Sequence, residues 1–195
     1  MGNFQKRKIG DIASITTGLV VKRKQAELPE KIIKKYKMLT LKSFEQDGWL
    51  NVEELEEFES NEMLDDKYLT QEGDVIVRLS YPNTAIVIDK DHIGLLIPSL
   101  FTVIRLETDI LIPEYLSIYL NSDKMKRYYA KRLIGSAIQI IKTSMLRDVV
   151  VMFPDINQQK KVVEINKLIL KEKKLLSQLI EEKNKYHKAI INKMM

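Results

Sequence analysis

In the stretch Val149-Val150-Val151-Met152-Phe153-Pro154-Asp155-Ile156-Asn157-Gln158, a continuous apolar run is followed directly by the start of a helical pattern. The apolar run of residues 149–153, closed by Pro154, predicts a buried strand. Asp155 can cap a helix, with Gln158 three residues later, and no glycine or proline follows from Ile156 onward. The sequence therefore predicts a strand that ends one domain, followed by one long helix to residue 195.

The predicted helix carries a stripe of apolar residues. Ten positions from 162 to 193 alternate spacings of three and four, and seven are apolar. These seven are Val162, Ile165, Ile169, Leu176, Leu179, Tyr186 and Ile190. Residues 158–193 would span about 54 Å as a helix, which exceeds the width of a domain of this size. We therefore expect the stripe to form a coiled coil with a partner; the alternative is a helix folded back on its own core.

Residues 1–156 read as a mixed α/β domain. Strands of one twisted sheet are expected at 36–41, 75–79, 85–89 and 101–106, and a helix is expected to open at Pro113 and run to Tyr129. The predicted fold class is therefore α/β (α+β), with a mixed-sheet domain at 1–156 and the long helix at 157–195.

Composition narrows the class of protein. The chain has 195 residues, 45% apolar and 30% charged, which suits one ordinary hydrophobic core. Cysteine is absent and no N-terminal apolar stretch suggests secretion, so we expect no disulfide scaffold and a cytoplasmic location. No apolar run approaches the roughly 20 residues that a bilayer crossing needs, so no membrane association is expected.

Charge is distributed unevenly. The net charge is +5, and residues 157–195 alone hold ten Lys against four Glu. Residues 1–44 carry eleven basic and three acidic groups, whereas residues 45–74 carry one basic and twelve acidic groups. This pattern predicts a basic lobe for a polyanion and an acidic lobe that faces away from it; the alternative is an ordinary solvated surface.

Catalytic patterns are absent from the sequence. Seven scattered glycines form neither a P-loop nor a dinucleotide-binding motif, and two histidines without cysteine make a zinc site improbable. Pro154-Asp155 followed by Glu172-Lys173-Lys174 resembles a nuclease pattern, but these groups would face different sides of a helix. We therefore predict no catalytic residue and no metal ligand, which disfavours a stand-alone nuclease or methyltransferase.

Several short motifs occur in an order typical of one family. They are Ile9-Gly10-Asp11-Ile12-Ala13, Thr17-Gly18, Leu69 with Glu72-Gly73-Asp74-Val75-Ile76, Ile112-Pro113-Glu114-Tyr115-Leu116, Gly135-Ser136, Leu146-Arg147-Asp148-Val149, and Phe153-Pro154 with Gln158-Gln159. Over nearly its whole length the sequence resembles the specificity subunit of type I restriction-modification enzymes. The order of the motifs is more specific than any one of them.

The resemblance implies a target recognition domain that reads double-stranded DNA and a helix that serves as spacer and docking site. Full-length members carry two such units, so this chain resembles a half-size, non-catalytic subunit that forms a homodimer. Its implied partners are methyltransferase (modification) subunits and a restriction subunit, which would use S-adenosylmethionine, ATP and Mg²⁺; this chain itself would bind no cofactor. The alternative function is an adaptor or anti-restriction decoy that occupies methyltransferase subunits through the helix.

Three segments combine residue types that bind phosphates and base edges. The candidate DNA-binding residues are Lys22, Arg23, Lys24, Arg78, Ser80, Tyr81, Asn83, Ser136, Gln139 and Lys142. The alternatives are a solvated loop for residues 22–24, an ordinary turn for residues 81–83 and an exposed strand position for Gln139.

Overall fold

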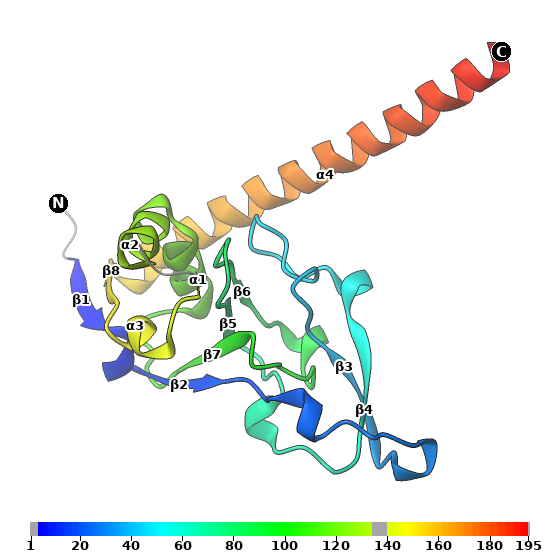
Figure 1. The fold of residues 1–195 in the computed structure, drawn as a ribbon. Coiled ribbons are helices and arrows are strands. Elements are labelled where there is room, and N and C mark those ends of the chain that lie inside the picture. The colour runs from blue at the N-terminus through cyan, green and yellow to red at the C-terminus, as the bar shows by residue number, and fades with distance from the viewer. Residues whose placement is uncertain (1–3, 134–139, 195) are drawn as a thin grey trace.

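The computed structural model describes residues 4–133 and 140–194. The strands are β1 (Gln5–Lys8), β2 (Ala13–Thr17), β3 (Lys34–Met38), β4 (Glu56–Ser60), β5 (Val75–Arg78), β6 (Ala85–Val87), β7 (Phe101–Leu106) and β8 (Val150–Phe153). The α-helices are α1 (Pro113–Asn121), α2 (Asp123–Leu133), α3 (Thr143–Arg147) and α4 (Ile156–Met194). This is the predicted mixture of sheets and helices with a long C-terminal helix, which Figure 1 shows projecting from the rest of the chain.

The central sheet has four antiparallel strands in the order β2-β7-β5-β6. The consecutive apolar residues of β5 fit a sheet covered on both faces. Val75 and Val77 belong to a cluster with Leu116 and Leu120 of α1, whereas Ile76 packs in a second cluster on the other face. The side chains of Val75, Ile76 and Val77 are fully buried, and only Arg78 at the end of β5 is partly accessible.

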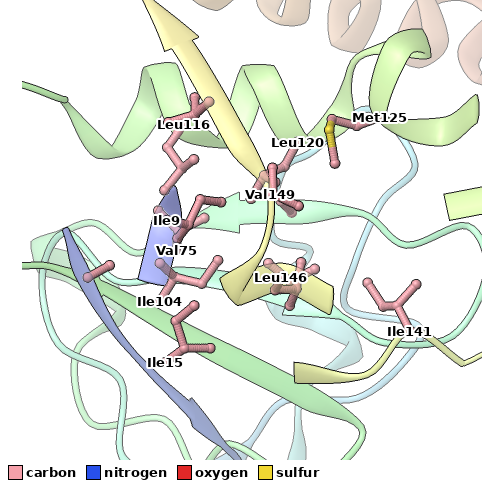
Figure 2. Packing of buried hydrophobic residues seen from close by; sticks show 14 of the residues in the cluster. Ile9, Ile15, Val75, Ile104, Leu116, Leu120, Met125, Ile141, Leu146 and Val149 are labelled. Atoms are coloured by element: carbon pink, nitrogen blue, oxygen red, sulfur yellow. The ribbon is translucent and has the colours of Figure 1, made fainter. Parts of the chain in front are cut away.

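The cluster that contains Val75 and Val77 also includes side chains from the first and the last segments of the domain. Figure 2 shows Ile9, Ile15 and Ile104 lying close to Leu146 and Val149, with Leu116 and Leu120 of α1 above them. β8 pairs with β1 in antiparallel register, so the segment before α4 is fixed to the start of the chain. Val151 and Phe153 of β8 are fully buried, whereas Val150 is 45% exposed. β8 is the predicted strand, and one of its faces is partly open.

The expected strand at 36–41 was assigned to the wrong sheet. β3 ends at Met38 and pairs with β4 in a separate two-stranded sheet. The remaining strand of the central sheet is β2, which lies at its edge beside β7. Leu39 leaves the strand to pack in the second cluster. β2 was missed because its five residues, Ala-Ser-Ile-Thr-Thr, present only two apolar side chains to the core.

The expected single helix from Pro113 to Tyr129 is two helices. It is interrupted at Ser122, whose backbone is extended (φ −65°, ψ 153°). The Ser122 carbonyl accepts bonds from Met125 N and Lys126 N, and its hydroxyl accepts from Met125 N at 3.4 Å. Ser122 therefore acts as an N-cap for α2, a role that competes with a continuous helix.

The basic and acidic stretches do not form two separate lobes. Because β3 and β4 are hydrogen-bonded neighbours, Lys35 lies opposite Glu59 and Lys37 lies opposite Glu57. Lys35 forms ion pairs with Glu57 (2.8 Å) and Glu59 (2.7 Å), and Lys24 pairs with Glu62 at 2.8 Å. Charges that are segregated in the sequence are interleaved across the hairpin, so the prediction of a basic and an acidic lobe was wrong here.

α4 has one face toward the domain and a different face with the apolar stripe. Asp155 Oδ1 accepts from Gln158 N at 3.0 Å, as the predicted cap requires. Gln159 and Val163 are buried, although both lie beyond the predicted domain boundary at 156. At 3.6 residues per turn, the apolar stripe lies on the side of α4 opposite these two residues. Among the described residues, none of the helices has the length and apolarity of a membrane span.

Candidate nucleic-acid interface

Segments far apart in the sequence meet at the turn after β5. Leu79 N donates to Leu100 O at 3.0 Å, and Ile141 N donates to Leu79 O at 3.0 Å. Ser80 forms an isolated antiparallel bridge with Ile140. The β5–β6 turn therefore lies between the segment that precedes β7 and the segment that precedes α3.

The end of β2 joins the same surface. Thr17 Oγ1 and Thr143 Oγ1 are 3.0 Å apart, and Gly18 N donates to Phe101 O at 3.0 Å. A Cβ at Gly18 would lie only 2.2 Å from Pro98 O, so this close approach requires glycine. We call the resulting surface the turn surface, and it comprises Thr17, Ser80, Tyr81, Leu100, Ile140 and Lys142.

Tyr81 supplies the aromatic ring of the turn surface, and 73% of its area is accessible. The turn beneath it is well defined, because Asn83 N donates to Ser80 O at 2.8 Å and Arg78 N donates to Thr84 O at 2.9 Å. Leu100 and Ile140 are 48% and 42% exposed beside it, and Lys142 is exposed. The surface thus combines an aromatic ring, apolar groups, hydroxyls and a cation, which suit base edges and phosphates.

Asn83 and Arg78 are engaged within the protein. Asn83 has a positive φ of 57° and is 7% exposed, and its Nδ2 donates to Leu79 O at 2.7 Å. Arg78 Nε donates to Ser80 Oγ at 3.1 Å, and its Nη1 donates to Leu41 O at 3.0 Å. Partial burial lowers the pKa of the Arg78 guanidinium from its ordinary value. Both side chains shape the turn surface, and their predicted contact with DNA stays a prediction.

Residues 22–24 lie toward the β3–β4 hairpin. Val21–Arg23 form a short 3-10 helix in which Lys22 and Arg23 are exposed. Lys24 forms an ion pair with Glu62, and its carbonyl accepts from Asn61 N at 2.9 Å. The described contacts thus join this basic segment to the hairpin, while residues 78–83 and 140–142 are brought together at the turn surface. Ser136 and Gln139 lie outside the described residues.

Thr17 and Leu100 of the turn surface were not among the sequence candidates. Each of these residues reaches the turn surface through contacts between distant segments. No local pattern in the sequence could have marked them.

The predicted partner residues of α4 are accessible. Val162 and Ile190 are each 38% exposed and Ile169 is 45% exposed; the other four, Ile165, Leu176, Leu179 and Tyr186, range from 51% to 65%. No clustering of three or more His, Cys, Asp or Glu side chains suited to a metal occurs within residues 4–133 and 140–194.

Comparisons with known proteins agree with this architecture. The family model described as "Type I restriction modification DNA specificity domain" matches residues 1–193. No curated protein matches the chain.

Three solved structures have a similar fold. The HsdS subunit from Thermoanaerobacter tengcongensis matches with a TM-score of 0.66 at 14% identity, over 90% of this chain and 44% of that one. The type I restriction-modification S subunit from M. genitalium matches with a TM-score of 0.56 at 17% identity, over 92% and 42% of the two chains. A chain from a structure of type I R-M complex assembly matches with a TM-score of 0.59 at 15% identity, over 89% and 40%.

The chain thus spans less than half the length of each of these relatives. At such low identity the structural matches show the fold, whereas the family match covers almost the entire sequence. The chain belongs to the family of type I restriction-modification DNA specificity domains, whose members are non-catalytic DNA-recognition subunits.

Proposed function

We propose that this chain acts as a half-size specificity subunit that dimerises through α4 and reads a bipartite, inverted DNA site. Residues 1–156 would form the target recognition domain, and residues 157–195 would form the spacer and docking helix. The family match over residues 1–193 and the coverage of 40–44% of related S chains support one recognition unit within these 195 residues.

The observation that carries the proposal is the apolar stripe of α4, which faces away from the domain. Its seven apolar side chains remain at least 38% exposed, and every described residue from 171 onward is exposed. A predominantly apolar face of this length is characteristic of a helix that packs against another helix. A second copy in antiparallel orientation would bury both stripes and create a symmetric pair.

The turn surface would contact base edges in a groove, and Lys22, Arg23, Lys24 and Lys142 would contact phosphates. In a two-fold dimer the two domains present identical surfaces in opposite orientation, so the target would be two short inverted half-sites. The length of the helix, about 54 Å over residues 158–193, bounds the separation of the half-sites at roughly sixteen base pairs.

Chemistry would belong to other subunits. The dimer would bring methyltransferase subunits to the target for adenine methylation, and a restriction subunit would cleave unmodified DNA. In this proposal those subunits use S-adenosylmethionine, ATP and Mg²⁺, and the complex works in the cytoplasm. A decoy that occupies methyltransferase subunits without reading DNA would use the same helix but would not need the turn surface.

The salt dependence of DNA binding tests the proposal. The probe is a duplex selected by the wild-type protein from a pool of random sequence. Replacing Lys22, Arg23 and Lys24 together by Gln should reduce the slope of log affinity against log salt by up to ~0.9 per lost phosphate contact. The matched control replaces three exposed lysines of α4, Lys160, Lys161 and Lys188, by Gln and should leave the slope closer to that of the wild type.

An unchanged slope in the triple variant would remove residues 22–24 from the interface. If the wild type selects no sequence at all but still binds methyltransferase subunits, the decoy function is the correct one.

A further inference from the structure

α4 contacts the domain at two places along its length. The proximal contact is formed by Gln159 and Val163, which are 0% and 6% exposed. Gln159 Nε2 donates to Ile110 O and Pro154 O at 2.8 Å each, and its Oε1 accepts from Ile112 N at 3.0 Å. This contact fixes the first turns of the helix.

The distal contact lies about four turns further along the helix, at the loop of residues 47–49. Lys173 forms an ion pair with Asp47, and Lys174 Nζ lies 5.0 Å from the centroid of the Trp49 ring. The distance along α4 from Gln159 to Lys173 is about 21 Å. We call these four residues, Asp47, Trp49, Lys173 and Lys174, the distal contact.

Between the two contacts the helix and the domain are separated by a cavity of about 1020 Å³. Glu72, Asp89 and Glu114 line it on the domain side, and Lys167 and Lys171 line it on the helix side. Lys167 and Glu114 approach to 3.8 Å. Along this stretch α4 and the domain are therefore less closely packed than at Gln159 and Val163.

The loop that contacts the distal part of the helix packs against the end of α1, next to the central sheet. Gly48 has a positive φ of 86°, and its N–H donates to Glu45 O at 2.9 Å. A Cβ at Gly48 would lie 2.7 Å from Asn121 Nδ2, so the turn sits directly on the end of α1. Asn121 in turn binds both Ala85 N (2.8 Å) and Ala85 O (2.7 Å), at the start of β6.

We propose that Asp47 and Trp49 are positioning residues that set the direction of α4 relative to the recognition domain, and thereby the separation of the two DNA half-sites. The second part rests on the proposed function. A small change in the direction of α4 moves its far end by a large distance, because the helix continues for about 52 Å from Gln159 to Met194. A tilt of about 10° at the proximal contact would move the far end by about 9 Å, which exceeds two base-pair steps of ~3.4 Å.

We expect the distal contact to respond to salt. The side chains of Lys173 and Asp47 are 53% and 45% exposed, and exposed ion pairs are weak and screened by ions. We therefore expect the freedom of α4 to increase with ionic strength. The effect should be lost once Asp47 is neutralised.

A distance measurement between two spin labels tests the mechanical part. The sequence contains no cysteine, so Ser14→Cys in β2 and Lys188→Cys on α4 would carry the only labels. Dilution with unlabelled protein keeps each measured distance within one chain of a dimer. The distance distribution should be narrow in the parent and should broaden or shift by about 5 Å or more after Asp47→Asn with Trp49→Ala.

Two further variants separate positioning from a general loss of structure. Lys185→Gln removes a lysine whose ion pairs, within the described part of the chain, are with Glu181 and Glu182 of the same helix, and it should leave the distribution unchanged. The charge exchange Asp47→Lys with Lys173→Asp, made in a chain that keeps Trp49, should give a narrow distribution like that of the parent. An unchanged distribution in the Asp47/Trp49 variant would overturn the proposal.

Selection from a pool of random duplex DNA tests the link to half-site separation. The wild type should enrich inverted half-sites at one gap, and the Asp47/Trp49 variant should enrich the same half-sites at several gaps. If both proteins enrich one identical gap, the positioning role in DNA recognition is wrong. If the wild type enriches no bipartite site, the proposed function fails, and the spin-label result still decides whether the distal contact directs α4.

Discussion

The domain and the distal part of α4, residues 171–194, both carry regular apolar patterns, yet they reach opposite states of burial. Val75, Ile76 and Val77 of β5 are fully buried, whereas Leu176 and Leu179 are 53% and 51% exposed. The domain covers both faces of its sheet with its own segments, and Figure 1 shows the distal helix extending beyond them. The domain therefore completes its hydrophobic core within one chain, whereas the apolar side chains of the distal helix remain accessible.

The largest expected effect comes from placing charge on the free stripe. Leu176→Glu with Leu179→Glu should convert a dimer into monomers, because buried leucines contribute ~2–5 kcal/mol each and unpaired buried carboxylates add a further cost. Light scattering at micromolar concentration measures the mass. The denaturant concentration at the midpoint of domain unfolding should be the same for the monomeric variant and for wild-type protein that is dilute enough to be monomeric.

The matched control is Asn184→Glu with Lys188→Glu, at exposed positions of the same helix but away from the stripe. This control should remain a dimer. A wild type that is monomeric at micromolar concentration would contradict the homodimer and leave the stripe to a different partner.

A smaller effect is expected at the junction of the two regions. Gln159→Ala removes a side chain that satisfies Ile110 O, Ile112 N and Pro154 O, and leaving such groups unpaired costs about 1–3 kcal/mol. Chemical denaturation should report this loss. Gln158→Ala, one residue earlier and exposed, should change the stability by less than about 0.5 kcal/mol.

Equal effects of the two glutamine substitutions would mean that the first turns of α4 are not anchored to the domain. The entire helix α4, and not just its distal part, would then be independent of the domain.

The features that the sequence predicted correctly are encoded locally. α4 follows from an N-cap at Asp155 and an uninterrupted run without glycine or proline, and β5 and β7 follow from dense β-branched residues. β2 was missed because Ala13 and Ile15 are a weak signal without their partners in β7. The break at Ser122 was missed because a serine hydroxyl can cap a helix only when the chain turns there.

The candidate interface was predictable in part. The β5–β6 turn was recognisable from Tyr81, Pro82 and Asn83, but the sequence could not show that the Asn83 amide is used within the turn. Thr17 and Lys142 reach the turn surface only through long-range contacts, such as the one between Thr17 and Thr143. The interleaving of charges across β3 and β4 likewise depends on strand register, which composition does not reveal.

The proposed half-size subunit can be tested by mapping methylated adenines in a host genome with and without this gene. The gene-dependent sites should be two short, identical half-sites in inverted orientation, separated by one fixed gap of no more than roughly sixteen base pairs. A single continuous site, or two unrelated half-sites with this chain as the sole specificity gene, would contradict this proposal.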